Sequence, residues 1–208
     1  MPLAGVIRVT STDTFCHAVL PEIVARLTKQ ADDLSFELLC SNAHLDLSRM
    51  HADVTVRPTF KLPDDLYGEV AAQLGVGFYS ADDVPPDHWL GLSGVIARAH
   101  FAQRFMEAME PKGIKLVAAA DSFLTLRAMA EAGLGRVVLP CVLGDASPKL
   151  HRIAPPLEIS PIPVFVASHA DLADAPRLRL ARRRVAAALA AQSDRLLGII
   201  PTEASNSA

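Results

Sequence analysis

Residues 9–24, VTSTDTFCHAVLPEIV, place a cysteine and a histidine side by side behind a run of hydroxyl and carboxylate side chains. A thiol beside an imidazole could form a nucleophilic pair or supply half of a metal site. On a helix, however, adjacent residues point about 100° apart, so Cys16 and His17 would not face each other. We therefore expect Cys16 to pack as a small apolar residue at a strand-to-helix junction.

The remaining histidines and glycines give no stronger sign of catalysis. The seven histidines follow no HxH, HExxH or Cys–His metal spacing. The chain also lacks GxSxG, P-loop and GxGxxG motifs, and its GLG at 133–135 ends a predicted helix. We expect no catalytic residue, no metal site and no cofactor.

Two stretches of the sequence follow the same pattern. RVTSTDTF (8–15) and LVAAADSF (116–123) each lead from a predicted strand, through Ser, Thr or Asp, to a helix that starts near Phe. In a parallel α/β sheet, ligands bind beyond the carboxyl ends of strands, against helix N-termini. Any one of these polar residues is more often a helix cap. Two equivalent junctions favour a shared ligand site, with Ser11, Thr12 and Ser122 as its hydroxyl groups.

A third predicted strand, DVTVR (53–57), ends at Arg57 and is followed by Pro58 and Thr59. Its guanidinium would lie at the same edge of the sheet as Ser11, where it could grip a carboxylate or phosphate through two parallel bonds. A surface arginine paired with a nearby aspartate fits this position equally well. Asp13 and Asp121 would instead favour a ligand with hydroxyl or amine donors, so the charge of the ligand is left open.

The predicted elements alternate between strand and helix, which indicates an α/β fold with mostly parallel sheets. The pattern restarts near residue 80, which indicates two similar lobes that the chain joins through residues 80–87 and 154–161. We expect strands at 5–9, 34–40, 53–57, 88–94, 114–119, 136–141 and 162–168, and a hairpin-like pair at 66–72 and 76–80. We expect helices at 15–30, kinked or beginning regularly at Pro21, and at 42–50, 97–110, 121–135 and 176–192.

Composition excludes several classes of protein. The formal net charge of −3 gives no overall attraction to nucleic acid or an anionic membrane. Three scattered cysteines are typical of reduced thiols in the cytoplasm, and no apolar run reaches membrane-spanning length. The N-terminus shows no export signal. We interpret the arginines between 177 and 184 as a solvated helix face with ion pairs, because they lack interleaved aromatic residues.

Four stretches carry a family resemblance: GVIRVT…LPEIVARL, DLSRMHADVTVRPT, AMAEAGLGRVVLPCVLGD and SHADLADAPRLRLARRRVAAAL. Together they resemble the effector-binding domain of LysR-type bacterial transcriptional regulators, over about residues 4–192. ADVTVRP, EAGLGRVVLPC and the His-x-Asp-Leu…Pro-Arg-x-Arg stretch are the most specific parts. Their order and spacing are hard to reproduce by chance.

The resemblance implies a fold of two Rossmann-like lobes joined by two crossovers, as in type 2 periplasmic binding proteins. The effector-binding domain would span residues 1–200, with lobe I at about 1–77 and 164–200, lobe II at about 78–163, and a disordered tail at 201–208. A small-molecule effector would bind between the lobes. The implied contacts are Ser11, Thr12, Ser41, Arg57, Thr59, Asp121, Ser122 and Phe123.

The same resemblance implies partners. It implies a homodimer or tetramer, with the first helix and residues 97–110 as candidate interface. The composition, by contrast, is what indicates a cytoplasmic location without membrane contact. Family members carry a helix-turn-helix ahead of this domain, so DNA would be bound only through that domain, which we expect to be missing from this chain. A solute-binding protein of a transport system and a small α/β enzyme stay open as alternatives. The first predicts an export signal, and the second predicts turnover of a bound ligand.

Overall fold

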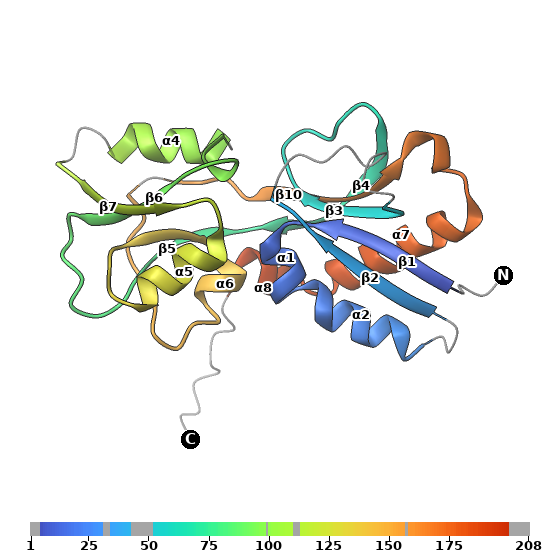
Figure 1. The fold of residues 1–208 in the computed structure, drawn as a ribbon, viewed down its shortest axis with the longest axis horizontal. Coiled ribbons are helices and arrows are strands. Elements are labelled where there is room, and N and C mark those ends of the chain that lie inside the picture. Colours follow the sequence, from blue (N-terminus) through green and yellow to red (C-terminus); the bar gives the residue numbers. More distant parts are fainter. Residues whose placement is uncertain are drawn as a thin grey trace, which may run out of the picture.

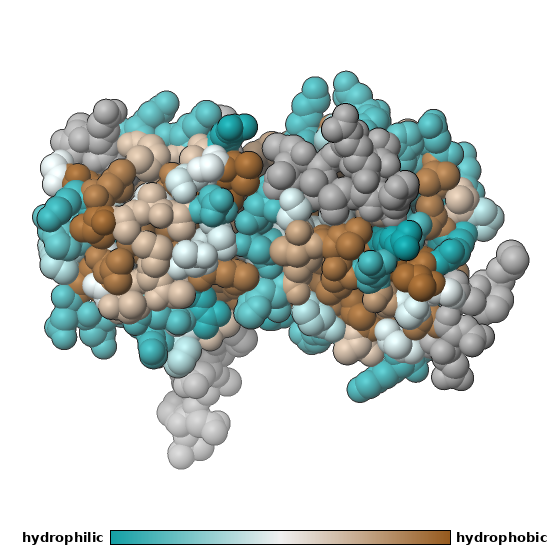
Figure 2. All heavy atoms as spheres, viewed as in Figure 1, coloured by the Kyte–Doolittle hydropathy of each residue, from teal (hydrophilic) through white to brown (hydrophobic). Residues whose placement is uncertain are grey.

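The computed structural model describes residues 5–30, 34–42, 52–98, 100–109, 113–156 and 158–199. They form two α/β lobes side by side, joined by extended chain (Figure 1). On the face shown in Figure 2, a band of hydrophilic residues separates two more apolar areas, one over each lobe. Most of the helix predicted at 42–50 and all of the tail at 201–208 lie outside the described residues.

Lobe I is built on a mixed five-stranded sheet in the order β2-β1-β3-β10-β4. Strand β1 runs parallel to β2 and β3, whereas β10 is antiparallel to β3 and β4. Val54 and Val56 of β3 are fully buried, in keeping with a strand near the middle of the sheet. The strands are β1 (Gly5–Ser11), β2 (Leu34–Cys40), β3 (Val54–Pro58), β4 (Leu66–Leu74) and β10 (Ile162–His169).

The helix predicted at 15–30 is two helices, α1 (Asp13–Ala18) and α2 (Leu20–Thr28). The break falls at Val19, and Pro21 lies in the first turn of α2, where its missing N–H costs no hydrogen bond. This matches the expectation that a regular helix begins at Pro21. Helix α2 contacts α7 (Pro176–Ala190), and both pack against strands of the sheet (Figure 1).

Lobe II contains two small sheets. The first is antiparallel, in the order β8-β5-β9, and the second pairs β6 with β7 in parallel. Its core holds Phe78, Trp89 and Phe105, whose ring centroids lie 5.8–6.1 Å apart. The elements are β5 (Val76–Ser80), β6 (His88–Leu92), η1 (Ile96–Arg98), α4 (His100–Met109), β7 (Lys115–Ala120), α5 (Phe123–Glu131), β8 (Val137–Pro140), α6 (Cys141–Gly144) and β9 (His151–Arg152).

The predicted hairpin of 66–72 with 76–80 is wrong. Strand β4 pairs with β10 in lobe I, whereas β5 pairs with β8 and β9 in lobe II. Gly75 alone separates the two strands, and one residue is too short for a hairpin turn. The chain therefore crosses between lobes at Gly75, and residues 80–87 lie within lobe II. It returns through the segment that leads to β10, as expected.

The crossing at Gly75 is held by backbone contacts on both sides. The Gly75 N–H donates to Leu196 O at 2.8 Å, and Gly75 O accepts from the N–H of Cys141 at 2.9 Å. Leu196 belongs to α8 (Ser193–Leu197), which lies between the lobes in Figure 1. A Cβ on Gly75 would lie 2.2 Å from Leu197 O, so only glycine fits this close approach.

Helix α8 is itself fastened to both lobes by arginines. From α8, Arg195 donates to Ala18 O in lobe I at 2.8 Å. From lobe II, Arg152 donates to Gly198 O, directly after α8, at 2.7 Å. The end of the described chain therefore bridges the two lobes at their crossing point.

The basic run of α7 is not wholly solvated, which corrects our expectation. Arg182 is 6% exposed and donates to Ser168 Oγ and, at 2.8 Å, to Ala173 O. Its guanidinium also lies 5.3 Å from the ring centroid of Tyr67. Arg182 therefore fastens α7 to β10 and β4, because a buried guanidinium needs such partners. Arg179 on the same helix is exposed, as expected.

We predict that Gly75→Ala loosens α8. Because the added Cβ would collide with backbone, the substitution should lower the free energy of unfolding by about 1–3 kcal/mol and speed amide hydrogen exchange in residues 194–198. Gly133→Ala is the matched control, since a Cβ at Gly133 meets no atom within 4 Å and strains only its positive φ of 78°. Unchanged exchange in α8 in Gly75→Ala would contradict this account.

Candidate functional site

The two strand-to-helix junctions meet in the structure. The Ser122 hydroxyl, at the start of α5, donates to Asp13 Oδ2, in the first turn of α1, at 2.5 Å. Beside it, Asn42 Nδ2 donates to Asp121 O at 3.3 Å. Both bonds join lobe I to lobe II, so the pairing of the junctions that the sequence suggested is present as direct contact.

Asp13 is oriented by its own helix. Its Oδ1 accepts the N–H of Thr14 at 2.6 Å, which leaves Oδ2 to face Ser122. Its backbone N–H donates to Asn42 Oδ1 at 3.0 Å. Ser122 has two roles, because its hydroxyl also accepts the N–H of Thr125 at 3.3 Å and so caps α5. The Ser122 hydroxyl therefore both caps α5 and forms the bond between the lobes.

Three of the predicted hydroxyl groups differ in what they contact. Ser11 is fully buried, and its hydroxyl donates to Val56 O at 2.6 Å. The Thr59 hydroxyl donates to Lys61 O at 2.9 Å, within its own turn. The Thr12 hydroxyl is buried and makes no hydrogen bond to any residue that the structure describes. Thr12 is therefore the one of the three whose hydroxyl has both its donor and acceptor capacity unused within the described chain.

The other predicted residues lie on both sides of the contact. On lobe I, Ser41 follows β2, and its N–H donates to Ser11 O at 2.9 Å. On lobe II, Asp121 is exposed and uses its backbone oxygen toward Asn42, while Phe123 packs half-buried against the hydrophobic core. The structure thus brings the two junctions together but leaves the Asp121 carboxylate at the surface.

Arg57 lies at the carboxyl end of β3, where it is half-buried and where burial lowers its pKa. The thiols of Cys16 and Cys40 are among its electrostatic neighbours. Burial raises the pKa of the Cys16 thiol to about 12, and Arg57 only partly opposes this rise. At neutral pH Cys16 is therefore a protonated thiol packed against the core, in agreement with the sequence-based interpretation.

The sequence analysis did not predict a role for Asn42, which hydrogen-bonds to both lobes. Its Oδ1 accepts the N–H of Asp13 in lobe I, and its Nδ2 donates to Asp121 O in lobe II. The available signal was its position directly after Ser41, beyond the end of the strand at 34–40. A polar residue at the carboxyl end of a second parallel strand meets the criterion that was applied to Ser11 and Arg57.

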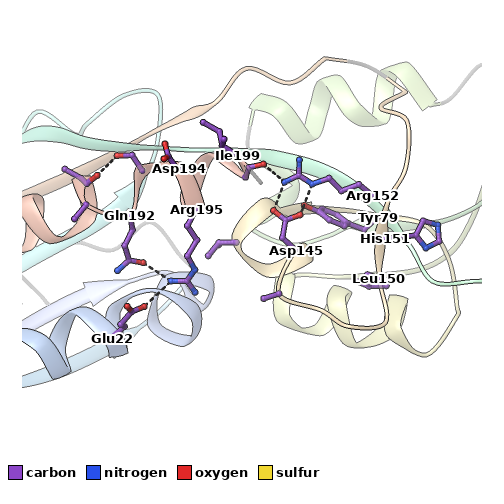
Figure 3. Close-up of a pocket in the computed structure, with 16 residues that line it drawn as sticks. Glu22, Tyr79, Asp145, Leu150, His151, Arg152, Gln192, Asp194, Arg195 and Ile199 are labelled. Atoms are coloured by element: carbon purple, nitrogen blue, oxygen red, sulfur yellow. Dashed lines mark hydrogen bonds and ion pairs between the residues drawn. The ribbon is translucent and has the colours of Figure 1, made fainter. Parts of the chain in front are cut away.

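A separate hollow of about 880 Å³ lies between the lobes next to α8 (Figure 3). Both of its arginines are paired with carboxylates: Arg152 binds Asp145 at 2.5 and 2.7 Å, and Arg195 lies 3.3 Å from Glu22. These pairs connect side chains of the lining to one another, so the two arginines already have acidic partners within the hollow. Its lining comes from several separate segments of the chain, so no motif could reveal it.

Two α/β lobes joined by two crossovers, with strand ends and helix starts facing each other between them, define a type 2 periplasmic-binding-protein-like domain. The sequence matches the family model of the LysR substrate binding domain over residues 2–190. The chain belongs to this family.

Solved structures agree on the fold. The regulatory domain of MexT, a transcriptional activator in Pseudomonas aeruginosa, superposes with a TM-score of 0.70 at 20% identity, covering 88% of this chain and 97% of that one. The CrgA regulatory domain, from a LysR-type transcriptional regulator of Neisseria meningitidis, gives 0.71 at 19%, covering 88% and 98%. The effector-binding domain of QuiR in complex with shikimate gives 0.70 at 12%, covering 91% and 98%.

No protein of curated function matches the sequence significantly. Within the described residues, no helix is long and apolar enough to cross a membrane. In the same part of the chain, no three side chains of the types that commonly bind metals come together.

We predict that Asp13 and Ser122 are energetically coupled across the lobes. A hydrogen bond to a charged group contributes about 1.5–3 kcal/mol. A double-mutant cycle of Asp13→Ala and Ser122→Ala should therefore show coupling of about 1–2 kcal/mol in the free energy of unfolding by urea. The cap on Thr125 is lost equally in both backgrounds and cancels.

Asp13→Ala combined with Ser147→Ala supplies the matched control for this cycle. The Ser147 hydroxyl donates to Glu131 within lobe II at 2.6 Å, so the two substitutions should be additive. Equal coupling in both cycles, or none in either, would show that the interlobe bond contributes nothing specific to stability.

Proposed function

We propose that this chain is the ligand-sensing domain of a LysR-type transcriptional regulator and that its effector binds between the lobes, where the two junctions meet. The observation that carries the proposal is the bond between Asp13 and Ser122, which places the starts of α1 and α5 in direct contact. A small molecule that enters here can exchange this bond for contacts of its own to both lobes. The QuiR domain, solved with shikimate, is a related domain that holds a small molecule.

The residues proposed to contact the effector come from both lobes. Lobe I offers the Thr12 hydroxyl, whose hydrogen-bonding capacity is unused within the described chain, and the Arg57 guanidinium. Lobe II offers Ser122 and Phe123 at the start of α5. The further proposed contacts are Ser11, Ser41, Thr59 and Asp121. An anionic group would bind at Arg57, whereas hydroxyl or amine donors would bind at Asp13.

The proposed mechanism is a shift in population between lobe arrangements. The effector favours whichever arrangement it binds more tightly: the side-chain contacts between the lobes change, while the crossing at Gly75 and the contacts of α8 keep the lobes attached. In the full regulator, a homodimer or tetramer formed through α1, α2 and α4 would carry this change to helix-turn-helix domains that bind DNA. This partnership, like a cytoplasmic location, is proposed from family membership.

A thermal-shift panel tests effector binding. Small carboxylates, aromatic acids, amino acids, sugars and amines are added to wild type, Arg57→Ala and Asp13→Ala. A ligand at a hundred times its Kd should stabilise the domain by about 2.7 kcal/mol, which at this length raises Tm by about 5–10 °C. The readout is the ligand-induced shift within each variant, so a changed baseline Tm does not matter.

Arg179→Ala is the control, because Arg179 is an exposed arginine on α7. An anionic ligand whose shift disappears in Arg57→Ala and persists in Arg179→Ala supports the site. A cationic or hydroxyl-bearing ligand should lose its shift in Asp13→Ala instead. A shift that survives both site substitutions places the ligand elsewhere, and no shift with any compound counts against a small-molecule sensor of these classes.

A further inference from the structure

Two cysteines from different elements meet at the edge of lobe I. Cys16 lies in α1, and Cys40 is the last residue of β2. Cys16 Sγ is 4.0 Å from Leu39 O, on the peptide that leads into Cys40, and the Cys40 side chain contributes to the raised pKa of the Cys16 thiol. Strand pairing brings them together, because Cys40 is in register with Ser11 on β1, directly before the loop into α1.

The two thiols differ in exposure. Cys40 is exposed and Cys16 is half-buried, whereas the third cysteine, Cys141, is buried in lobe II. A dissolved reagent therefore reaches Cys40 first. Arg57 is an electrostatic neighbour of both Cys16 and Cys40, and its positive charge stabilises negative sulfur during thiol chemistry. Cys40 is therefore the thiol that would attack first, and Cys16 is the nearby thiol that would then attack Cys40.

We propose that Cys16 and Cys40 form a redox-responsive pair, which low-molecular-weight disulfides oxidise to an intramolecular disulfide beside the interlobe contact. The Cys40 thiolate attacks one sulfur of the external disulfide, whose S–S bond breaks and releases one thiolate. Cys16 then gives its proton to water, attacks Cys40 Sγ and expels the second thiolate. Two protein thiols are oxidised, and the external disulfide is reduced to two thiols.

The location gives this bond an effect on the lobe contact. Asp13 lies in α1 with Cys16, and Asn42 follows Cys40 by two residues; both bond to lobe II. A covalent link between Cys16 and Cys40 would restrict both anchoring residues together. This inference does not depend on the proposed effector, because the thiol pair lies within lobe I.

The closing step should be strongly dependent on pH. The reactive species is the Cys16 thiolate, and burial raises the pKa of Cys16 to about 12. Below that value the thiolate fraction rises about tenfold for each unit of pH. We therefore expect the mixed disulfide on Cys40 to close faster at pH 9 than at pH 7.

The test uses oxidised glutathione as the probe, followed by denaturation without reductant, thiol titration and intact-mass measurement. Wild type should fall from three free thiols to one, with a mass loss of about 2 Da for the two hydrogens removed, and peptide mapping should link residues 16 and 40. Cys141→Ser is the matched control and should form the same link. Cys16→Ser should stop at one glutathione on Cys40.

Cys40→Ser should show no disulfide between the remaining thiols, and circular dichroism confirms that each variant is folded. The proposal is overturned if wild type holds glutathione on Cys40 at every pH without closing. It is equally overturned if all three thiols stay reduced, or if oxidation joins two copies of the chain through Cys40.

Discussion

The N–H of Gly75 donates to Leu196 O in α8, and its carbonyl oxygen accepts from the N–H of Cys141 in α6. The strand that crosses between the lobes therefore cannot move without disturbing one lobe or the other. Leu196 of α8 is fully buried at this point, and Arg152 and Arg195 fasten the same segment from opposite sides. The same two lobes are also joined where α1 lies opposite α5.

The contact between Asp13 and Ser122 is of a different kind. It joins side chains through one charge-assisted bond, which contributes about 1.5–3 kcal/mol, whereas the crossing consists of close-packed backbone. A ligand with a micromolar Kd has a binding free energy of about −8 kcal/mol. Such a ligand can therefore displace the side-chain contact without breaking the crossing. This difference separates the part of the interface that can respond from the part that holds the molecule together.

Much of this architecture follows from the sequence. Strand β2 was predicted at its observed residues, and the polar runs at 11–13 and 121–122 indicated the two junctions that now meet. These features depend on local patterns, namely apolar runs and caps. The crossing at Gly75 was misjudged, because two predicted strands separated by a short segment that contains glycine suggest a hairpin unless the strand partners are known.

The other differences between the sequence-based predictions and the structure also arise from tertiary contacts. Arg182 belongs to a run of arginines that reads as a solvated face, and only the packing of α7 on β10 and Tyr67 explains its burial. Asn42 and the pairing of Cys16 with Cys40 likewise depend on strand register. No spacing along the chain encodes these pairings.

The place of β10 in the sheet has a consequence for biosynthesis. Strand β10 lies between β3 and β4 in the sheet, so the strand that pairs with β4 does not exist until residues 162–169 have been made. The whole of lobe II is translated in the interval. Pairings of such large sequence separation form slowly, and an unpaired strand is prone to aggregate. On the ribosome, lobe II can therefore complete its sheets before lobe I, although lobe I is the first to emerge.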